Sequence, residues 1–236
     1  MYRHFFKRFF DIVCSFLGII ILALPMLIIA IIVKCDSKGP AIFVQERMGR
    51  NDKPFNFYKF RSMTTDAPKD VATKELHSEC YITKVGAFLR KTSLDELPQL
   101  FCILKGHMSF VGPRPVVLTE EDLLEYRRQT KANLIRPGLT GLAQINGRDC
   151  LVDMHRKAEL DGEYAKKITF WGDIKILFRT VGAVLKSEGI VEGDSVLTQE
   201  PATDSVAQPV AEAVLAEVAV AENCAQASSD TIEQVG

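Results

Sequence analysis

The sequence predicts an α+β protein that is mainly helical and is attached to a membrane by its amino-terminal segment. Three observations support this fold class. Residues 12–33 form a run of 22 residues without a charged side chain. Residues 40–63 alternate apolar and polar side chains around a turn-rich centre, which is typical of a β-hairpin. Apolar residues recur at helical spacing in residues 94–104 and 170–185.

The uncharged run is long enough to cross a bilayer, because a straight helix of this length would span roughly 33 Å. It is basic on both sides, however, whereas a single crossing segment favours an imbalance of Lys and Arg. Pro25 lies inside the run, and a proline removes one helical hydrogen bond and bends the axis. The residues alone leave two arrangements open: one kinked transmembrane helix, or a helix–break–helix that enters one leaflet and returns.

The stretch RKTSLDELPQ (residues 90–99) holds the strongest candidates for chemistry. Asp95 and Glu96 are adjacent, and Arg90 precedes them. Ser93 with Glu96 matches a capping box, which predicts that a helix begins here and that both carboxylates serve its first turn. Two carboxylates beside cations also suit a phosphate-handling site. Taken alone, the segment favours the capping interpretation.

Further candidates for anion binding lie on either side of this stretch. Lys59 and Arg61 fall in the second predicted strand (YKFRSM), where solvated strand charges are the favoured explanation from the residues alone. Arg114 lies between two prolines in VGPRPV, which fixes its direction in a way that suits a phosphate or carboxylate. The loop RPGLTGLAQINGR (136–148) is polar and turn-rich, and such loops commonly carry binding groups.

Residues 159–186 form a second helical region with an apolar stripe and several cations. A helix of this kind can lie on an anionic lipid surface. It can equally pack its stripe against the protein core. The residues do not separate the two interpretations.

Charge divides the chain into a basic body and an acidic tail. Residues 1–186 contain all 29 Lys and Arg against 20 Asp and Glu, whereas residues 187–236 contain 10 acids and no Lys or Arg. A basic body suits anionic partners such as lipid surfaces and phosphorylated substrates. No recognised motif supports nucleic-acid binding. From about residue 195 the chain lacks aromatic residues, which predicts a disordered acidic tail.

Several classes of site are not supported by the sequence. The six cysteines are scattered without a CxxC pair, and the four histidines have no metal-ligand spacing, so neither a zinc site nor a disulfide framework is predicted. Free thiols fit a reducing cytoplasm. The glycine patterns match neither a dinucleotide-binding fingerprint nor a P-loop.

From about Lys7 to Lys186 the sequence resembles the bacterial sugar transferase family, the monotopic polyprenyl-phosphate phosphoglycosyl transferases. The resemblance is to the minimal form with a single membrane segment. The motifs that carry it, in chain order, are KRFFD, GPAIFVQERMG, FYKFRSM, LRKTSLDELPQL, FVGPRPV, RPGLTGLAQINGR and LDGEYAKK…DIKIL. The acidic tail is not part of the family's pattern.

The resemblance implies a transferase that moves a sugar-1-phosphate from a UDP-sugar to polyprenyl (undecaprenyl) phosphate and releases UMP. This would be the first membrane step in assembling a glycan such as an exopolysaccharide, O-antigen, capsule or glycoprotein glycan. By that likeness Asp95 is the nucleophile and forms an aspartyl phospho-sugar intermediate. The resemblance also implies a Mg²⁺ beside Asp95. Glu96 is the second member of the family's catalytic dyad. The phosphate-binding cations are expected to be Lys59, Arg61, Arg90 and Arg114, and the nucleotide-sugar contacts Arg136, Gln144 and Arg148.

The resemblance also implies a re-entrant membrane helix that is broken at Pro25. Many relatives have a serine before this proline, whereas this chain has Leu24. The expected organisation is a re-entrant helix in residues 1–38, a cytoplasmic catalytic domain with amphipathic interfacial helices in residues 39–194, and the tail in residues 195–236.

The expected location is the cytoplasmic face of the bacterial inner membrane. The expected partners are the UDP-sugar, the polyprenyl phosphate and membrane lipid, with a homodimer and downstream glycosyltransferases as further candidates and no nucleic acid. The competing hypothesis is a membrane-anchored scaffold whose acidic tail recruits partners. A scaffold needs no catalytic dyad, so turnover separates the two.

Overall fold

The computed structural model describes residues 2–67, 81–146 and 154–185, so the predicted acidic tail lies outside the described residues. Most of the described chain is helical, and its strands form two sheets of two strands each. The prediction of a mainly helical α+β fold with an apolar helix at its amino-terminal end is confirmed.

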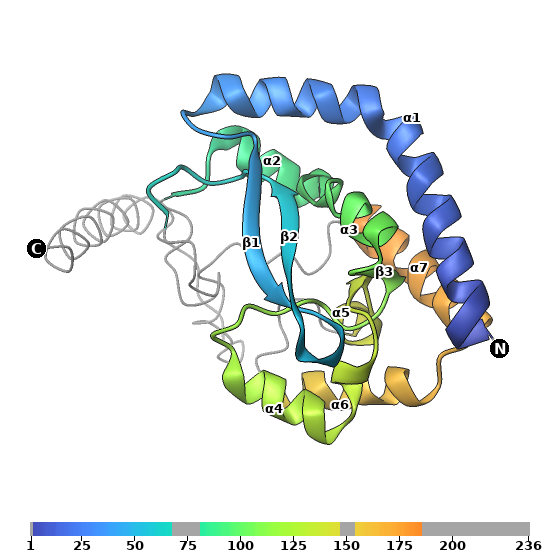
Figure 1. The fold of residues 1–236 in the computed structure, drawn as a ribbon. Coiled ribbons are helices and arrows are strands. Elements are labelled where there is room, and N and C mark those ends of the chain that lie inside the picture. Colours follow the sequence, from blue (N-terminus) through green and yellow to red (C-terminus); the bar gives the residue numbers. More distant parts are fainter. Residues whose placement is uncertain (1, 68–80, 147–153, 186–236) are drawn as a thin grey trace, which may run out of the picture. The chain divides into compact units, whose positions relative to one another are not determined.

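The predicted membrane segment lies in one long helix. A π-helical turn, η1 (Tyr2–Phe6), leads into α1 (Lys7–Asp36), which has 30 residues. Within the described chain, α1 is the one helix long and apolar enough to cross a membrane. The helix continues through Pro25 and bends part-way along its length (Figure 1). The interruption predicted at Pro25 is therefore not present, because the helix bends without ending.

The predicted β-hairpin is confirmed. Strand β1 (Ile42–Met48) pairs antiparallel with β2 (Pro54–Phe60), and Ile42 lies opposite Phe60. The turn between them is a 3₁₀ segment, η2 (Arg50–Asp52), in which Asn51 adopts a left-handed conformation that asparagine tolerates better than most residues.

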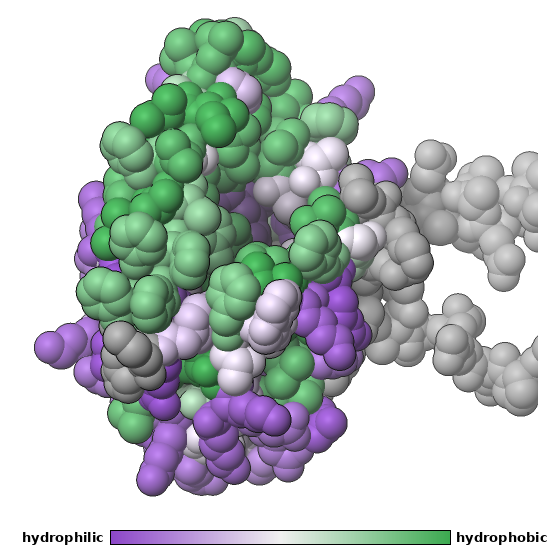
Figure 2. All heavy atoms as spheres, turned by 90° about the vertical axis from the view of Figure 1, so that its right-hand side faces the viewer, coloured by the Kyte–Doolittle hydropathy of each residue, from purple (hydrophilic) through white to green (hydrophobic). Residues whose placement is uncertain are grey.

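One side of α1 packs over this hairpin and over two short helices, α2 (Lys84–Thr92) and α3 (Gln99–Lys105) (Figure 1). Met26 and Val33 of α1 share a buried cluster with Phe60 of β2 and Leu89 of α2. Most of the remaining surface of α1 is not covered by other described residues, and large apolar side chains along its length are exposed. They form the apolar face shown in Figure 2.

The predicted helix start at Ser93 is wrong. Ser93 adopts a left-handed conformation that ends α2, and no side-chain hydrogen bond caps the 3₁₀ turn η4 (Leu94–Glu96) that follows. The next helix, α3, begins only after Pro98. A proline is tolerated in the first turn of a helix but not in its interior, so Pro98 sets the earliest point at which this helix can start.

The remaining elements form the other side of the domain. Strand β3 (Ser109–Val111) pairs in parallel with β4 (Gly138–Thr140). The helical region predicted in residues 159–186 is two helices rather than one. The helical elements are α4 (Glu121–Gln129), η5 (Ala132–Leu134), α5 (Leu142–Ile145), α6 (Met154–Lys166) and α7 (Phe170–Leu185).

Helix α7 has an apolar face toward the core and another toward the outside. Ile176 is buried in a cluster with Val111 and Tyr164. Trp171 and Phe178 on the same helix are 75% and 76% exposed. Core packing therefore accounts for only part of the predicted stripe, and the exposed aromatic residues are of the kind found at membrane surfaces.

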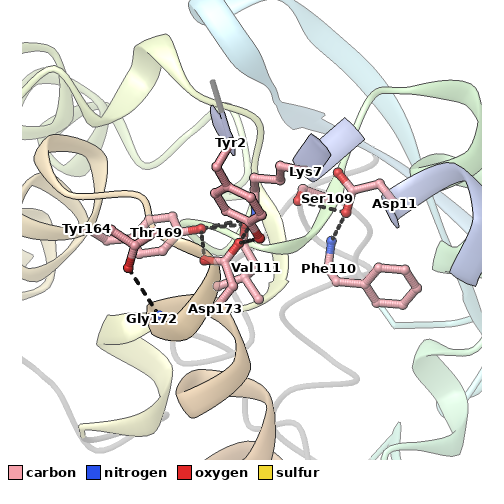
Figure 3. Close-up of polar contacts among 10 residues, drawn as sticks. All are labelled: Tyr2, Lys7, Asp11, Ser109, Phe110, Val111, Tyr164, Thr169, Gly172 and Asp173. Atoms are coloured by element: carbon pink, nitrogen blue, oxygen red, sulfur yellow. Dashed lines mark hydrogen bonds and ion pairs between the residues drawn. The ribbon is translucent and has the colours of Figure 1, made fainter. Parts of the chain in front are cut away.

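Both ends of α1 are bound to the globular part of the chain. At the amino-terminal end, Lys7 forms an ion pair of 2.6 Å with Asp173 of α7, and Tyr2 donates a hydrogen bond to the same carboxylate (Figure 3). Tyr164 of α6 donates to the other oxygen of Asp173. At the carboxyl-terminal end, Arg61 donates to carbonyl oxygens of the last turn and of the residues after it: those of Val33, Ser37 and Lys38.

Candidate active site

Asp95 lies on the tight turn η4 between α2 and α3. The left-handed Ser93 and the proline at position 98 confine this turn to a few residues, so its side chains have fixed directions. The side chains of Leu94 and Leu97, on either side of the dyad, pack against the cluster that contains Met26 of α1. The turn is thereby held beside the part of the apolar helix α1 that follows Pro25.

The Asp95 carboxyl group is buried among charges. Asp95 is 8% exposed, and its pKa is raised to about 6, first by burial and then by the neighbouring Glu96 carboxylate. Three cations oppose this rise: Lys59 of β2, Arg114 of the loop after β3, and Arg90 of α2. The structure thus brings together residues from four separate segments around one carboxyl group, which we call the Asp95 cluster: Lys59, Arg90, Asp95, Glu96 and Arg114.

Glu96 holds one of these cations. Its Oε1 accepts a hydrogen bond of 2.8 Å from Nη2 of Arg114 in an ion pair. Both side chains are partly exposed, so the pair lies at the mouth of the cluster while Asp95 is buried. This gives Glu96 an observed role in orienting Arg114.

The Arg114 loop is fixed by two further arginines. Arg47 of β1 donates to the carbonyl oxygen of Pro115 (2.8 Å), and Arg127 of α4 donates to that of Arg114 (2.9 Å). Arg127 is itself held by Asp161 of α6 in a buried ion pair of 2.6 Å. A chain of contacts therefore runs from Asp161 of α6 through Arg127 of α4 to the backbone of Arg114, whose side chain pairs with Glu96.

Lys59 is a cation in an unfavourable environment. Its pKa is lowered to about 8, first by burial and then by the nearby Arg47. Its ammonium group lies 5.2 Å from the centre of the Phe43 ring on the paired strand. Because its charge is destabilised in the free protein, an anion bound in the cluster would be attracted strongly to it.

The described residues contain no group of three or more metal-ligating side chains. Asp95 and Glu96 are nevertheless adjacent carboxylates in a cluster suited to phosphate. Mg²⁺ is usually bound through one or two carboxylates together with substrate phosphates and water. Asp95 and Glu96 are therefore the residues of this cluster that could hold such an ion together with a phosphorylated substrate.

Three predicted site residues have other contacts in the structure, and a fourth cannot be placed. Arg61 caps the end of α1 and is not among the groups that shift the pKa of Asp95. Arg136 donates to the carbonyl oxygen of Gly106, and its charged neighbours are Arg8, Arg50 and Asp11. Gln144 on α5 donates to the carbonyl oxygen of Leu139. Arg148 lies outside the described residues.

Two residues of the site were not predicted. Arg127 lies in the last turn of α4, and nothing in the local sequence marks it as buried. The sequence pattern could have indicated Arg47. It lies four residues after Phe43 in β1, so both side chains are on the same face of the hairpin, and Phe43 lies opposite Lys59.

Comparison with known proteins relates the whole described region to one family. The family described as bacterial sugar transferase matches residues 2–187. A Klebsiella pneumoniae protein named UDP-glucose:undecaprenyl-phosphate glucose-1-phosphate transferase is 45% identical over 75% of this chain and 39% of its own length. A Salmonella typhimurium protein named undecaprenyl-phosphate galactose phosphotransferase is 43% identical over 78% of this chain and 41% of its own length.

A third relative is of similar size to this chain. The Bacillus subtilis protein named uncharacterized sugar transferase EpsL is 39% identical over 82% of this chain and 94% of its own length. The chain thus spans about two fifths of the length of the first two relatives and nearly all of the third.

Proposed function

This chain belongs to the bacterial sugar transferase family, and we propose that it transfers a sugar-1-phosphate from a UDP-sugar to undecaprenyl phosphate with release of UMP. The observation that carries this proposal is the Asp95 cluster, a buried carboxyl group surrounded by three cations and placed beside an apolar helix. The names of the two relatives that specify an acceptor both contain undecaprenyl phosphate, and they differ in the sugar.

In the first step, a carboxylate oxygen of Asp95 attacks the β-phosphorus of the UDP-sugar. The new Asp95–phosphorus bond forms as the bond from that phosphorus to the bridging oxygen breaks, and UMP leaves with the electron pair. In the second step, a phosphate oxygen of the carrier attacks the same phosphorus. The bond to Asp95 then breaks, which restores the carboxylate and yields the polyprenyl diphosphate sugar.

The cations of the cluster make this attack possible. A diphosphate would repel a lone carboxylate, whereas Lys59, Arg90 and Arg114 can neutralise charge on the phosphate oxygens as the bond forms. Glu96 keeps Arg114 aimed at the site. Mg²⁺ bound with the diphosphate through Asp95 would supply further charge neutralisation.

The direct test is turnover by the full-length protein. Undecaprenyl phosphate, Mg²⁺ and a panel of UDP-sugars are supplied, and UMP is measured. We expect sustained UMP release with at least one donor, and only when the carrier is present. If folded protein releases no UMP with any donor, the proposal is wrong and the scaffold hypothesis is favoured.

The pH dependence of turnover follows from two members of the cluster. Asp95 must be ionised to attack, so activity should rise as the pH passes upward through about 6. Lys59 must be protonated to bind phosphate, so activity should fall as the pH passes upward through about 8. We expect a bell-shaped profile of kcat/KM. Lys59→Arg should remove the alkaline limb, because arginine stays charged. An unchanged alkaline limb in this variant would show that another group titrates there.

We also propose that α1 enters and leaves the membrane on one side, at the cytoplasmic face of the bacterial inner membrane. The support is that both of its ends contact the same globular body, through Lys7 with Asp173 and through Arg61 with Ser37. A helix that crossed the bilayer would place its ends about 30 Å apart on opposite sides. The exposed apolar face of α1 and the bend in its path are consistent with a shallow, re-entrant course.

The topology can be tested by cysteine labelling in a chain whose six native cysteines have been replaced. One new cysteine is added before Met1 and another replaces Lys38. An impermeant thiol reagent applied to intact cells should label neither position, and both should react in inverted membrane vesicles. Labelling of one position from each side would establish a transmembrane helix instead.

A further inference from the structure

A second site lies at the amino-terminal end of α1, near the carboxyl-terminal end of α3. Asp95 lies on the turn that precedes the other end of α3. It is a cavity of about 140 Å³. Cavities of roughly 150 Å³ hold a molecule the size of benzene, so a phosphate group and its nearest substituents would fit. Apolar residues such as Val111 and Ile168 form part of the wall, and Ser109 and Tyr164 contribute hydroxyl groups. Half of the lining residues are charged: Arg3, Lys7, Arg8, Asp11, Arg50 and Arg136.

The cavity has an excess of positive charge. Five of its lining residues are cations and one is a carboxylate, and Lys7 is already paired with Asp173. The Asp11 carboxylate accepts hydrogen bonds from Ser109 Oγ (3.0 Å) and from the backbone N–H of Phe110 (3.1 Å) (Figure 3). Among the described residues, none of the four lining arginines has an ion-pair partner.

The arginines are held in place by carbonyl oxygens. Arg8 donates to those of Ile103 and Leu104 at the end of α3 (2.6 and 2.8 Å). Arg136 donates through Nε to Gly106, and Arg50 donates through Nε to Leu134. A guanidinium group has five N–H donors, so each arginine keeps donors for a ligand. Burial lowers the pKa of Arg136, and so does repulsion from Arg8 and Arg50. An anion would relieve this repulsion.

Exposed aromatic side chains lie beside the cavity residues in the sequence. Two pairs of phenylalanines flank the lining residues Lys7 and Arg8 and are 41–63% exposed: Phe5, Phe6, Phe9 and Phe10. These rings suit the boundary between lipid chains and headgroups, where phosphates lie.

We propose that this cavity binds the phosphate of an anionic phospholipid headgroup. Arginines bind phosphate bidentately, and basic groups beside a membrane-embedded helix attract anionic lipid. The carrier phosphate is a poorer candidate, because in the proposed reaction it must reach Asp95. The seven residues of α3 separate the two sites by roughly 10 Å.

Full-length protein in neutral detergent provides the test, with Trp171, the chain's only tryptophan, as a fluorescent reporter. The probes are dihexanoyl-phosphatidylglycerol, dihexanoyl-phosphatidylcholine, inorganic phosphate and farnesyl phosphate. We expect the phosphatidylglycerol to bind saturably and at least tenfold more tightly than the other three. Equal binding of the two lipids would overturn the proposal. Tighter binding of inorganic phosphate, or of farnesyl phosphate, would assign the cavity to a soluble phosphate or to the carrier instead.

Two exposed arginines allow the site to be altered without disturbing the core. Arg50→Gln and Arg3→Gln should each weaken phosphatidylglycerol binding about tenfold, the effect of losing one charge-assisted hydrogen bond. Lys53→Gln is the matched control, because it removes the same charge from the same turn of the hairpin but lies outside the cavity lining. Unchanged binding in both arginine variants, or an equal loss in Lys53→Gln, would show that no specific site exists.

Discussion

Asp95→Asn is expected to lower sustained UMP release by at least about 10³-fold, because an amide oxygen cannot form the covalent intermediate that a carboxylate can. Glu96→Gln should have a smaller effect, since Glu96 acts through Arg114. Asp122→Asn is the matched control, because it makes the same chemical change at an exposed carboxylate on α4 and should leave turnover unchanged. Full turnover in Asp95→Asn would show that Asp95 is not the nucleophile.

The same substitution has a predicted effect on stability. The folded-state pKa of Asp95 is raised from 3.8 to about 6. The ionised form is therefore disfavoured by folding, and this destabilisation develops as the pH rises from about 4 to about 6 and persists above it. An uncharged asparagine removes it. At neutral pH the variant should unfold at the same temperature as the parent or at a higher one, and a clear decrease would contradict this electrostatic account.

The second large effect is expected at the buried ion pair of Arg127 and Asp161. Arg127→Met leaves the Asp161 carboxylate buried without its partner, and such a loss costs about 3–5 kcal/mol in the free energy of unfolding. For a domain of this size each kcal/mol lowers the unfolding temperature by about 2–4 °C. Arg156→Met, in the exposed pair with Glu159, is the control and should change the free energy of unfolding by less than about 1 kcal/mol.

A double variant separates the contribution of Arg127 to stability from its role in positioning the Arg114 backbone. Arg127→Met combined with Asp161→Leu removes both charges, so much of the lost stability should return. Turnover should remain reduced, because the carbonyl oxygen of Arg114 still lacks the donor that Arg127 provides. Restoration of both stability and full turnover would show that Arg127 matters for packing alone.

The sequence predicted the elements whose signals are local. The uncharged run gave the apolar helix, and the alternation on either side of residues 49–52 gave the hairpin. The helix start at Ser93 was predicted wrongly, because the capping pattern is local but Pro98 and the left-handed Ser93 outweigh it. Sequence alone could not predict whether α1 would break at Pro25 or continue through it, since neighbouring packing decides how a helix accommodates a proline.

The candidate site depended on contacts that no local pattern records. Lys59 and Arg114 reach Asp95 from segments far away in the chain, and Arg127 meets Asp161 across 34 positions. The residues alone marked Lys59, Arg61 and Arg114 as candidates for anion binding, and the resemblance to a family joined them with Arg90 in one phosphate site. The structure brings Lys59, Arg90 and Arg114 together around Asp95. Arg61 instead binds the end of α1, and Arg136, predicted as a nucleotide-sugar contact, lines the basic cavity.

Trapping of the covalent intermediate tests the central claim most directly. The protein is incubated with the UDP-sugar that gives the fastest UMP release, without undecaprenyl phosphate, and its peptides are analysed by mass spectrometry. We predict one phospho-sugar on the peptide that carries Asp95, its absence in Asp95→Asn, and its loss when the carrier is added. Active enzyme that shows no adduct on Asp95, or an adduct on another residue that the carrier consumes, would contradict the account.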